Sequence, residues 1–358
     1  MRLLSAIAAA ISAAAFFATP GGVQAEEAAR ISGPHTHQNL SIYFVHGTSA
    51  QGPVPLTLQE ALDKGAVEVI ETGSVNELQI RNKGDTEIFI QSGDIVKGGR
   101  QDRVVTVSFI LPVKSGDVPL ASFCVEHGRW SARGKEDAGK FASSGEAIPS
   151  REAKLAMKAP LVAMTGQSAS HRLNEPEQGA NRGTEISERQ LKVWDEVRKT
   201  QTKLSGGLKE RVNAAASESS LQLALENEKL QASRADYIKA LEGQGMSADD
   251  IVGYAFAVNG RINSADVYPS NALFRKMWPK LLAASVTEAI GETTDAPAAA
   301  PPAGTAVTEF LANAETGTHS GQDIAGLAEQ DVRDADKSVF VGVRTKQGAW
   351  VHRNYLLK

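Results

Sequence analysis

The sequence predicts an α+β protein, because strand-like and helix-like segments follow one another in separate runs. A strand-rich N-terminal half comes first, a helical middle follows, and a β-hairpin with a helix behind it comes next. A small C-terminal β-hairpin module ends the chain. Regular alternation of strand and helix is absent, so the order favours α+β over a doubly wound parallel sheet. The 358 residues are enough for one large domain or two medium ones.

The first 25 residues have the three parts of a secretory signal peptide. Arg2 precedes an apolar, alanine-rich run over 3–18, and Val-Gln-Ala at 23–25 is a small-residue cleavage pattern. The apolar run is shorter than the roughly 20 residues of a membrane-spanning helix, and an uncleaved anchor is the alternative. We therefore expect cleavage between Ala25 and Glu26, and a soluble periplasmic or secreted protein that has no membrane contact afterwards.

Strand signals dominate the N-terminal half. A capping box at Thr57 and Glu60 interrupts them and predicts a short helix that ends near Lys64, in front of a glycine. Apolar and β-branched runs predict strands over 39–46, 66–71, 77–81, 87–91, 104–113 and 118–126.

The middle of the chain changes character twice. Residues 131–185 are rich in Gly, Ser and charged side chains, which predicts a loop-rich insertion. A second capping box at 187–190 then opens a helix, and a looser helical pattern covers 219–241. The Asn-Gly pair at 259–260 predicts a tight hairpin, and Ser270 behind it caps a further helix.

These segments predict the domain organisation. The main α+β domain is expected over 33–291, with the insertion at about 131–185 inside it. An Ala/Pro-rich linker over 292–305 is expected to be semi-stiff. A small β module is expected over 306–358, because 339–344 and 349–356 have the pattern of a terminal hairpin.

Composition excludes several classes of function. With 38 basic and 42 acidic side chains the net charge is −4, so binding of nucleic acid through bulk positive charge is not expected. His35 and His37 could share a strand face and join a metal site, but the sequence has no His-Glu-x-x-His, Gly-x-Ser-x-Gly or dinucleotide-binding motif. We expect no metal and no cofactor.

A glycine- and arginine-rich segment over 92–103 is the most unusual polar feature. Arg100 and Arg103 carry guanidinium groups suited to a carboxylate or a phosphate, and the glycines let backbone amides approach a ligand closely. Gly93 and Gly98 have the spacing of a phosphate-binding loop, but the Lys-Ser/Thr pair of that loop is missing. The segment is therefore either a site for an anionic or polar ligand or a tight hairpin whose arginines pair with nearby acids.

A second polar segment covers 124–130. Cys124 is the single cysteine, and Arg129 could lower the pKa of its thiol and make it a catalytic nucleophile. The alternative is a buried core cysteine, with Glu126 and Arg129 paired at a strand end.

Five motifs along the chain resemble those of one known family. The first four are Thr-Leu-Gln-Glu-Ala-Leu at 57–62, Val-Asn-Glu-Leu at 75–78, the Gly/Arg-rich loop at 93–103 and Cys-Val-Glu-His-Gly-Arg-Trp at 124–130. The fifth is Val-Trp at 193–194 together with the hairpin and helix over 259–278. Over residues 33–291 the chain is similar to the ARG and rhodanese-phosphatase-superfamily-associated protein domain family, which is found largely in bacteria. The resemblance implies no defined activity, and we carry over neither rhodanese nor phosphatase chemistry. It does imply that the two polar segments belong to one domain.

We hypothesise that these two segments meet in space and form one pocket. Its lining would consist of Arg100, Gln101, Arg103, Glu126, Arg129 and Trp130. Arg100 and Arg129 on opposite faces of a sheet would contradict this hypothesis.

The function we expect is that of an exported binding or interaction domain that recognises a small anionic or polar ligand through the Gly/Arg-rich loop. The first alternative is a thiol- or carboxylate-dependent enzyme that uses Cys124 or Glu126 on an anionic substrate. The second is a scaffold that holds another protein of the cell envelope. At this point the sequence leaves open whether the protein is an enzyme.

Overall fold

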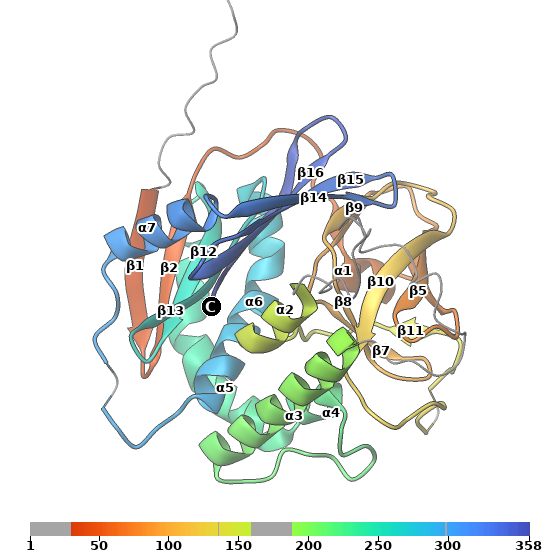
Figure 1. Ribbon diagram of the computed structural model, residues 1–358, viewed down its shortest axis with the longest axis horizontal. Coiled ribbons are helices and arrows are strands. Elements are labelled where there is room, and N and C mark those ends of the chain that lie inside the picture. The colour runs from red at the N-terminus through yellow and green to blue at the C-terminus, as the bar shows by residue number, and fades with distance from the viewer. Residues whose placement is uncertain (1–29, 135, 159–187, 298) are drawn as a thin grey trace, which may run out of the picture.

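A computed structural model describes residues 30–134, 136–158, 188–297 and 299–358 (Figure 1). The expected signal peptide and residues 159–185 of the expected insertion lie outside the described residues. The architecture is α+β, as predicted, with three sheets and the helices gathered around and between them. None of the described helices is both long enough and apolar enough to cross a membrane.

The largest sheet is antiparallel throughout and takes strands from both ends of the chain. In spatial order its strands are β1 (Arg30–His37), β2 (Leu40–His46), β12 (Ile251–Val258), β13 (Arg261–Val267), β17 (Trp350–Leu357), β16 (Ser338–Thr345), β15 (Ala328–Asp334) and β14 (Thr318–Ile324). The predicted Asn-Gly hairpin joins β12 to β13, and both turn residues have positive φ, 49° at Asn259 and 76° at Gly260.

The C-terminal residues 306–358 do form the predicted hairpin, but it does not stand apart as a module. Strand β17 pairs with β13, with Ala265 opposite Tyr355, so the hairpin continues the large sheet. Pairing of this kind satisfies the backbone groups of β13 that would otherwise form a sheet edge. The expected linker is also docked, since the Tyr43 hydroxyl donates to the Pro302 carbonyl at 2.5 Å.

Both faces of the large sheet are covered at β2, which explains the continuous apolar run in that strand. Ile42 and Phe44 face the side of α6 (Asn271–Gly291), whereas Tyr43 and Val45 belong to the cluster under α7 (Gly304–Ala314). Figure 1 shows α7 crossing β1 and β2, with α6 on the other side. A strand buried on both faces loses the polar alternation of a half-exposed strand.

Two smaller sheets form the other half of the molecule. One has the order β11 (Phe141–Ala142), β7 (Ile95–Gly98), β8 (Arg103–Val105), β10 (Val118–Cys124), β5 (Glu77–Asn82) and β4 (Val67–Glu71). The other has the order β3 (Leu56–Thr57), β6 (Ile88–Ile90) and β9 (Phe109–Leu111). The strand expected over 104–113 is in fact two, because β8 pairs with β10 and β9 pairs with β6 in a different sheet.

The remaining helices support these sheets. They are α1 (Leu58–Asp63), α2 (Arg151–Lys158), α3 (Glu188–Leu208), α4 (Leu221–Leu225) and α5 (Glu228–Leu241), with a 3₁₀ turn η1 (Glu242–Met246) after α5. The first capping box is present, since Thr57 and Glu60 bond each other's backbone amides. The helical pattern expected over 219–241 is divided, because Asn227 caps a new helix there.

Candidate functional site

The Gly/Arg-rich segment forms a tight β-hairpin. Strands β7 and β8 pair antiparallel, with Ile95 opposite Val104, and the turn lies between them. Gly98 and Gly99 have positive φ, and a Cβ on Gly99 would lie 2.3 Å from the Phe141 ring. The two glycines are therefore required by the backbone conformation and by the close approach of β11. The phosphate-loop spacing thus belongs to a hairpin, with no helix behind it.

The second polar segment lies against this hairpin. The residues expected to line one pocket do not line the cavity described below, and they are Arg100, Gln101, Arg103, Glu126, Arg129 and Trp130. The Arg129 guanidinium is 2.7 Å from the Glu126 carboxylate and 3.6 Å from that of Asp102, and both carboxylates are fully buried. Arg129 also donates to the Gly99 carbonyl at 3.2 Å. The side chain of Trp130 covers Arg100 and Arg103, whose guanidinium carbons lie 5.4 and 5.7 Å from its ring centre.

Further contacts turn these pairs into a network. Arg133 is 3.0 Å from Asp102, and Arg103 is 3.5 Å from Glu71. Backbone amides are bonded as well, since Asp102 accepts from Gly98 at 3.0 Å. We call this set the carboxylate–arginine network, and its charged members are Glu71, Asp102, Glu126, Arg103, Arg129 and Arg133.

Three buried carboxylates face three guanidinium groups in the network, and the partly exposed Glu136 adds a further carboxylate beside Arg133. Burial acts to raise the pKa of Glu126, but hydrogen bonds, first from Arg129, hold it below its ordinary value. Burial raises the pKa of Asp102, and this is opposed by the hydrogen bond from Arg133 and reinforced by the charge of Glu126. Arg103 and Arg129 are therefore engaged with protein acids, which favours the hairpin interpretation over direct anion binding by these two side chains. The Arg100 guanidinium lies against the Trp130 ring instead.

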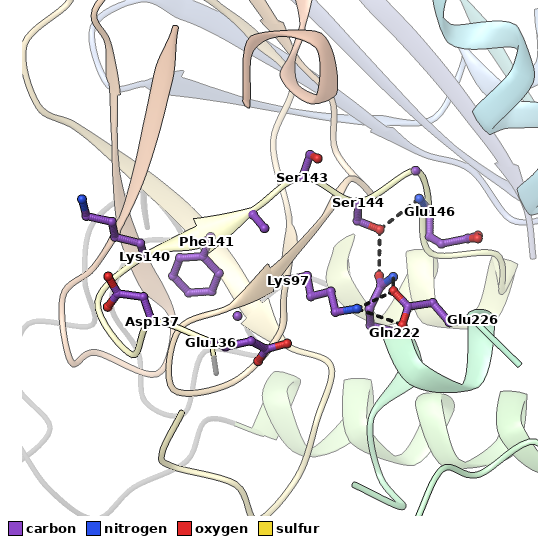
Figure 2. Close-up of a pocket in the computed structure, with 13 residues that line it drawn as sticks. Lys97, Glu136, Asp137, Lys140, Phe141, Ser143, Ser144, Glu146, Gln222 and Glu226 are labelled. Carbon is purple, nitrogen blue, oxygen red and sulfur yellow. Dashed lines mark hydrogen bonds and ion pairs between the residues drawn. The ribbon is translucent and has the colours of Figure 1, made fainter. Parts of the chain in front are cut away.

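A cavity of about 570 Å³ adjoins the network. Gly98 and Glu136 line it, and Glu136 accepts from Arg133 at 2.8 Å, so the cavity and the network share a wall. Its other lining residues are Lys97, Asp137, Lys140, Phe141, Ala142, Ser143, Ser144, Gly145, Glu146, Gln222 and Glu226. In Figure 2, Lys140, Asp137 and Phe141 lie at one end and Gln222 and Glu226 at the other.

One end of the cavity is held in place by polar contacts. Lys97 donates to both oxygens of Glu226, at 2.7 and 2.9 Å. Ser144 donates to the Gln222 side chain at 2.8 Å and accepts from the Glu146 backbone amide at 3.0 Å. The arrangement offers a ligand both acidic and basic side chains next to one aromatic ring.

Comparison with protein families gives a match along nearly the whole chain. The model of the ARG and Rhodanese-Phosphatase-superfamily-associated Protein domain, ARPP-1, matches residues 28–356. The chain belongs to the ARPP-1 domain family. No curated protein and no solved structure gave a significant match.

The extent of the ARPP-1 match agrees with the sheet pairing. It continues past residue 291, where the motifs seen in the sequence end, and includes the strands β14 to β17. The C-terminal hairpins are therefore part of the family's domain.

Cys124 of this ARPP-1 domain lies in the core. Its side chain has no exposed surface, and burial raises the pKa of its thiol to about 12. Its backbone amide and carbonyl bond the side chain of Gln190 at 2.8 and 2.9 Å. This geometry favours the buried cysteine over the reactive thiol, because the thiolate is the nucleophile.

The histidines near the N-terminus lie apart from the network. His35 packs against Phe44 and His37 against Tyr237. Within the described ranges, no group of three or more His, Cys, Asp and Glu side chains is placed to hold a metal ion.

Sequence reasoning missed Arg133, Glu71 and the cavity. Arg133 follows Arg129 at a spacing of four residues, which was the available signal for a second guanidinium. Gln222 and Glu226 reach the cavity from α4 and its C-cap, and their sequence has no feature that marks this position.

Proposed function

We propose that this ARPP-1 domain protein is an exported binding protein that takes a small polar ligand into the cavity beside the β7–β8 hairpin. The observation that carries the proposal is the cavity itself, about 570 Å³ in volume and lined by charged, hydroxyl and amide groups from β7, from residues 136–146 and from α4 with its C-cap. A pocket of this size is in the usual range for a small-molecule site. Export rests on the signal-peptide pattern of the first 25 residues.

The charges of the lining favour a ligand that carries an amino group over a simple anion. Four carboxylates and two lysines line the cavity, and within the part of the chain that the structure describes Asp137 alone among them has no ion-pair partner. Glu226 pairs with Lys97, Glu146 with Arg234 and Glu136 with Arg133. Asp137 accepts a backbone hydrogen bond from Gly139 at 2.8 Å, lines the cavity and is exposed.

The carboxylate–arginine network has a supporting role in this proposal. A binding wall must keep its shape when the ligand arrives, and buried ion pairs with several hydrogen bonds hold the hairpin against β10 and α4. The arginines of the network then contribute to binding indirectly, because they hold Gly98 and Glu136 in place in the cavity wall.

A ligand screen with a cavity-blocking variant tests the proposal. The protein starting at Glu26 is screened by thermal shift against amines, amino acids and simple anions, and hits are measured by calorimetry. The variant Ala142→Trp places a large side chain in the cavity from an exposed lining position. Ala138→Trp is the matched control, because Ala138 is exposed nearby and does not line the cavity.

We expect binding of an amine-bearing ligand to be lost in Ala142→Trp and kept in Ala138→Trp. Asp137→Asn should lower the affinity for the same ligand. Equal binding by both tryptophan variants would place the ligand elsewhere, and a preference for simple anions would contradict the charge argument.

A further inference from the structure

A serine and a lysine are in contact at the open end of the β7–β8 hairpin, away from its turn. Ser92 lies just after β6, and Lys158 is the last residue of α2. The Lys158 amine is 2.9 Å from the Ser92 hydroxyl and 2.8 Å from the Thr106 carbonyl. The Ser92 hydroxyl itself donates to that carbonyl at 2.9 Å. Ser92 and Lys158 are both half-buried residues.

We propose that Ser92 and Lys158 are a nucleophile and its general base, and that the site accepts an acyl group from a small ester. A hydroxyl in hydrogen-bond contact with an amine, which is oriented in turn by a third group, is the geometry of an activated nucleophile. The Thr106 carbonyl is that third group. None of the cavity-lining residues takes part, so the inference goes beyond the proposed binding function.

The surroundings of Lys158 favour the free amine that a base requires. Burial of the ammonium lowers the pKa of Lys158 to about 7, and the positive charge of Arg189 on α3 acts in the same direction. Asp266 on β13 opposes this shift. An amine with a pKa near neutrality has a large unprotonated fraction and can accept the serine proton.

A buried chain of hydrogen bonds and one close polar contact fixes the position of Ser92. Its backbone amide donates to the Ser108 hydroxyl at 3.0 Å, and this hydroxyl is 3.1 Å from Nδ1 of His352. Nε2 of His352 is 3.1 Å from Asp266. The rings of Phe89 and Tyr268 pack against His352.

The Ser108–His352–Asp266 chain has the residue types of a hydrolase triad, but its members are positioning residues here. Ser108 is 2% exposed and His352 is 2% exposed, so a substrate cannot reach the Ser108 hydroxyl in this conformation. Ser92 is the accessible hydroxyl of the group. The test therefore has to separate the two serines.

The reaction conserves atoms and electron pairs in four transfers. The Ser92 oxygen attacks the ester carbonyl carbon, and the hydroxyl proton moves to the Lys158 nitrogen. The carbon–oxygen bond to the leaving alcohol breaks, and Lys158 returns the proton to that oxygen. Water then attacks the acyl-serine and gives its proton to Lys158. The Ser92 oxygen departs and takes this proton back, which releases the acid.

The test uses the full chain after the predicted cleavage site and a fluorophosphonate probe, which transfers its phosphonyl group to an activated serine with loss of fluoride. Intact mass and peptide mapping identify the labelled residue. The variants are Ser92→Ala, Lys158→Met and Ser108→Ala, and the last of these separates labelling of Ser92 from labelling of Ser108. Lys158→Arg keeps a cation if the methionine variant fails to fold.

We expect a single adduct on Ser92 that is absent from Ser92→Ala and slowed about a hundredfold in Lys158→Met, the middle of the range for loss of a general base. Ser108→Ala should still be labelled on Ser92. In the wild type, labelling should rise about tenfold per pH unit below pH 7 and level off above it, because Lys158 must be deprotonated. Lys158→Arg should abolish this plateau.

An adduct on Ser108 would move the nucleophile to the buried chain and overturn the assignment. No adduct, or unchanged labelling in Lys158→Met, would also overturn it. Ligand binding in the cavity is measured separately, so failure here leaves the proposed function untouched.

Discussion

Removing the guanidinium of Arg129 should destabilise the protein, because that group neutralises two fully buried carboxylates. Its side chain is 10% exposed and contacts Glu126 at 2.7 Å and Asp102 at 3.6 Å. It also donates to the carbonyls of Gly99 and Ser131, at 3.2 and 2.5 Å. The variant Arg129→Met keeps an unbranched apolar side chain in place of the arginine stem and deletes the charge.

The expected loss of stability depends on the charges that remain buried after the arginine is removed. Breaking a buried pair by removing one partner costs about 3–5 kcal/mol, because the remaining charge has lost its compensation. Arg133 stays 3.5 Å from Glu126 and 3.0 Å from Asp102, so part of the compensation remains. We therefore expect the low end, about 3 kcal/mol at pH 7.

The assay is urea unfolding followed by tryptophan fluorescence, with Arg81→Met as the control. Arg81 makes two hydrogen bonds to Asp117, at 2.6 and 2.8 Å, but both side chains are about 40% exposed, at 42% and 40%. Exposed pairs contribute little because water solvates and screens them. The control should unfold at nearly the wild-type urea concentration.

The pH dependence gives a second check with a defined sign. Glu126 has a lowered pKa in the folded protein, so its contribution to stability is present above its unfolded pKa and is lost as pH falls through the folded value. In Arg129→Met the pKa of Glu126 rises, and the deficit relative to wild type should shrink towards low pH. A deficit no larger than that of Arg81→Met, or one independent of pH between neutrality and pH 3, would refute the reasoning.

Three further outcomes are expected. Cys124 should resist alkylation by iodoacetamide in the folded protein at pH 8 and react fully in urea, because burial raises its pKa to about 12; labelling of the folded protein would restore the reactive thiol. Gly99→Ala should lower the free energy of unfolding in urea by about 1–3 kcal/mol, because φ is +55° there and the added Cβ would meet the Phe141 ring, whereas the exposed Gly116→Ala should cost less, having no atom within 4 Å of the new Cβ. A chain ending at residue 337 lacks β16 and β17 and should be insoluble or lack cooperative unfolding by circular dichroism, since β13 becomes an open edge; a soluble, cooperative product would show that the hairpin is dispensable.

Local features of the structure could be predicted from short stretches of sequence. The capping box at Thr57 and Glu60 and the turn at Asn259 and Gly260 both appear as expected. Each depends on hydrogen bonds or backbone angles within four residues, so the neighbouring sequence contains the information. The contact of Arg100 with Trp130 joins the two polar segments that the family resemblance assigned to one domain.

Tertiary structure decided the roles that depend on distant partners. Whether Arg129 binds a ligand or Glu126 depends on which oxygen lies nearest to it after folding, and in the structure that oxygen belongs to Glu126. Arg133 and Glu71, from other segments, complete the ion pairs. Likewise, the apolar run over 104–113 divides between two sheets because its two ends find different partners in β10 and β6. The sequence by itself determined the α+β class, the family and the local caps and turns, because these depend on residue patterns and on hydrogen bonds between residues close together in the sequence. Strand pairing, the cavity and the Ser92–Lys158 contact arise only from global burial, which selects partners far apart in the sequence.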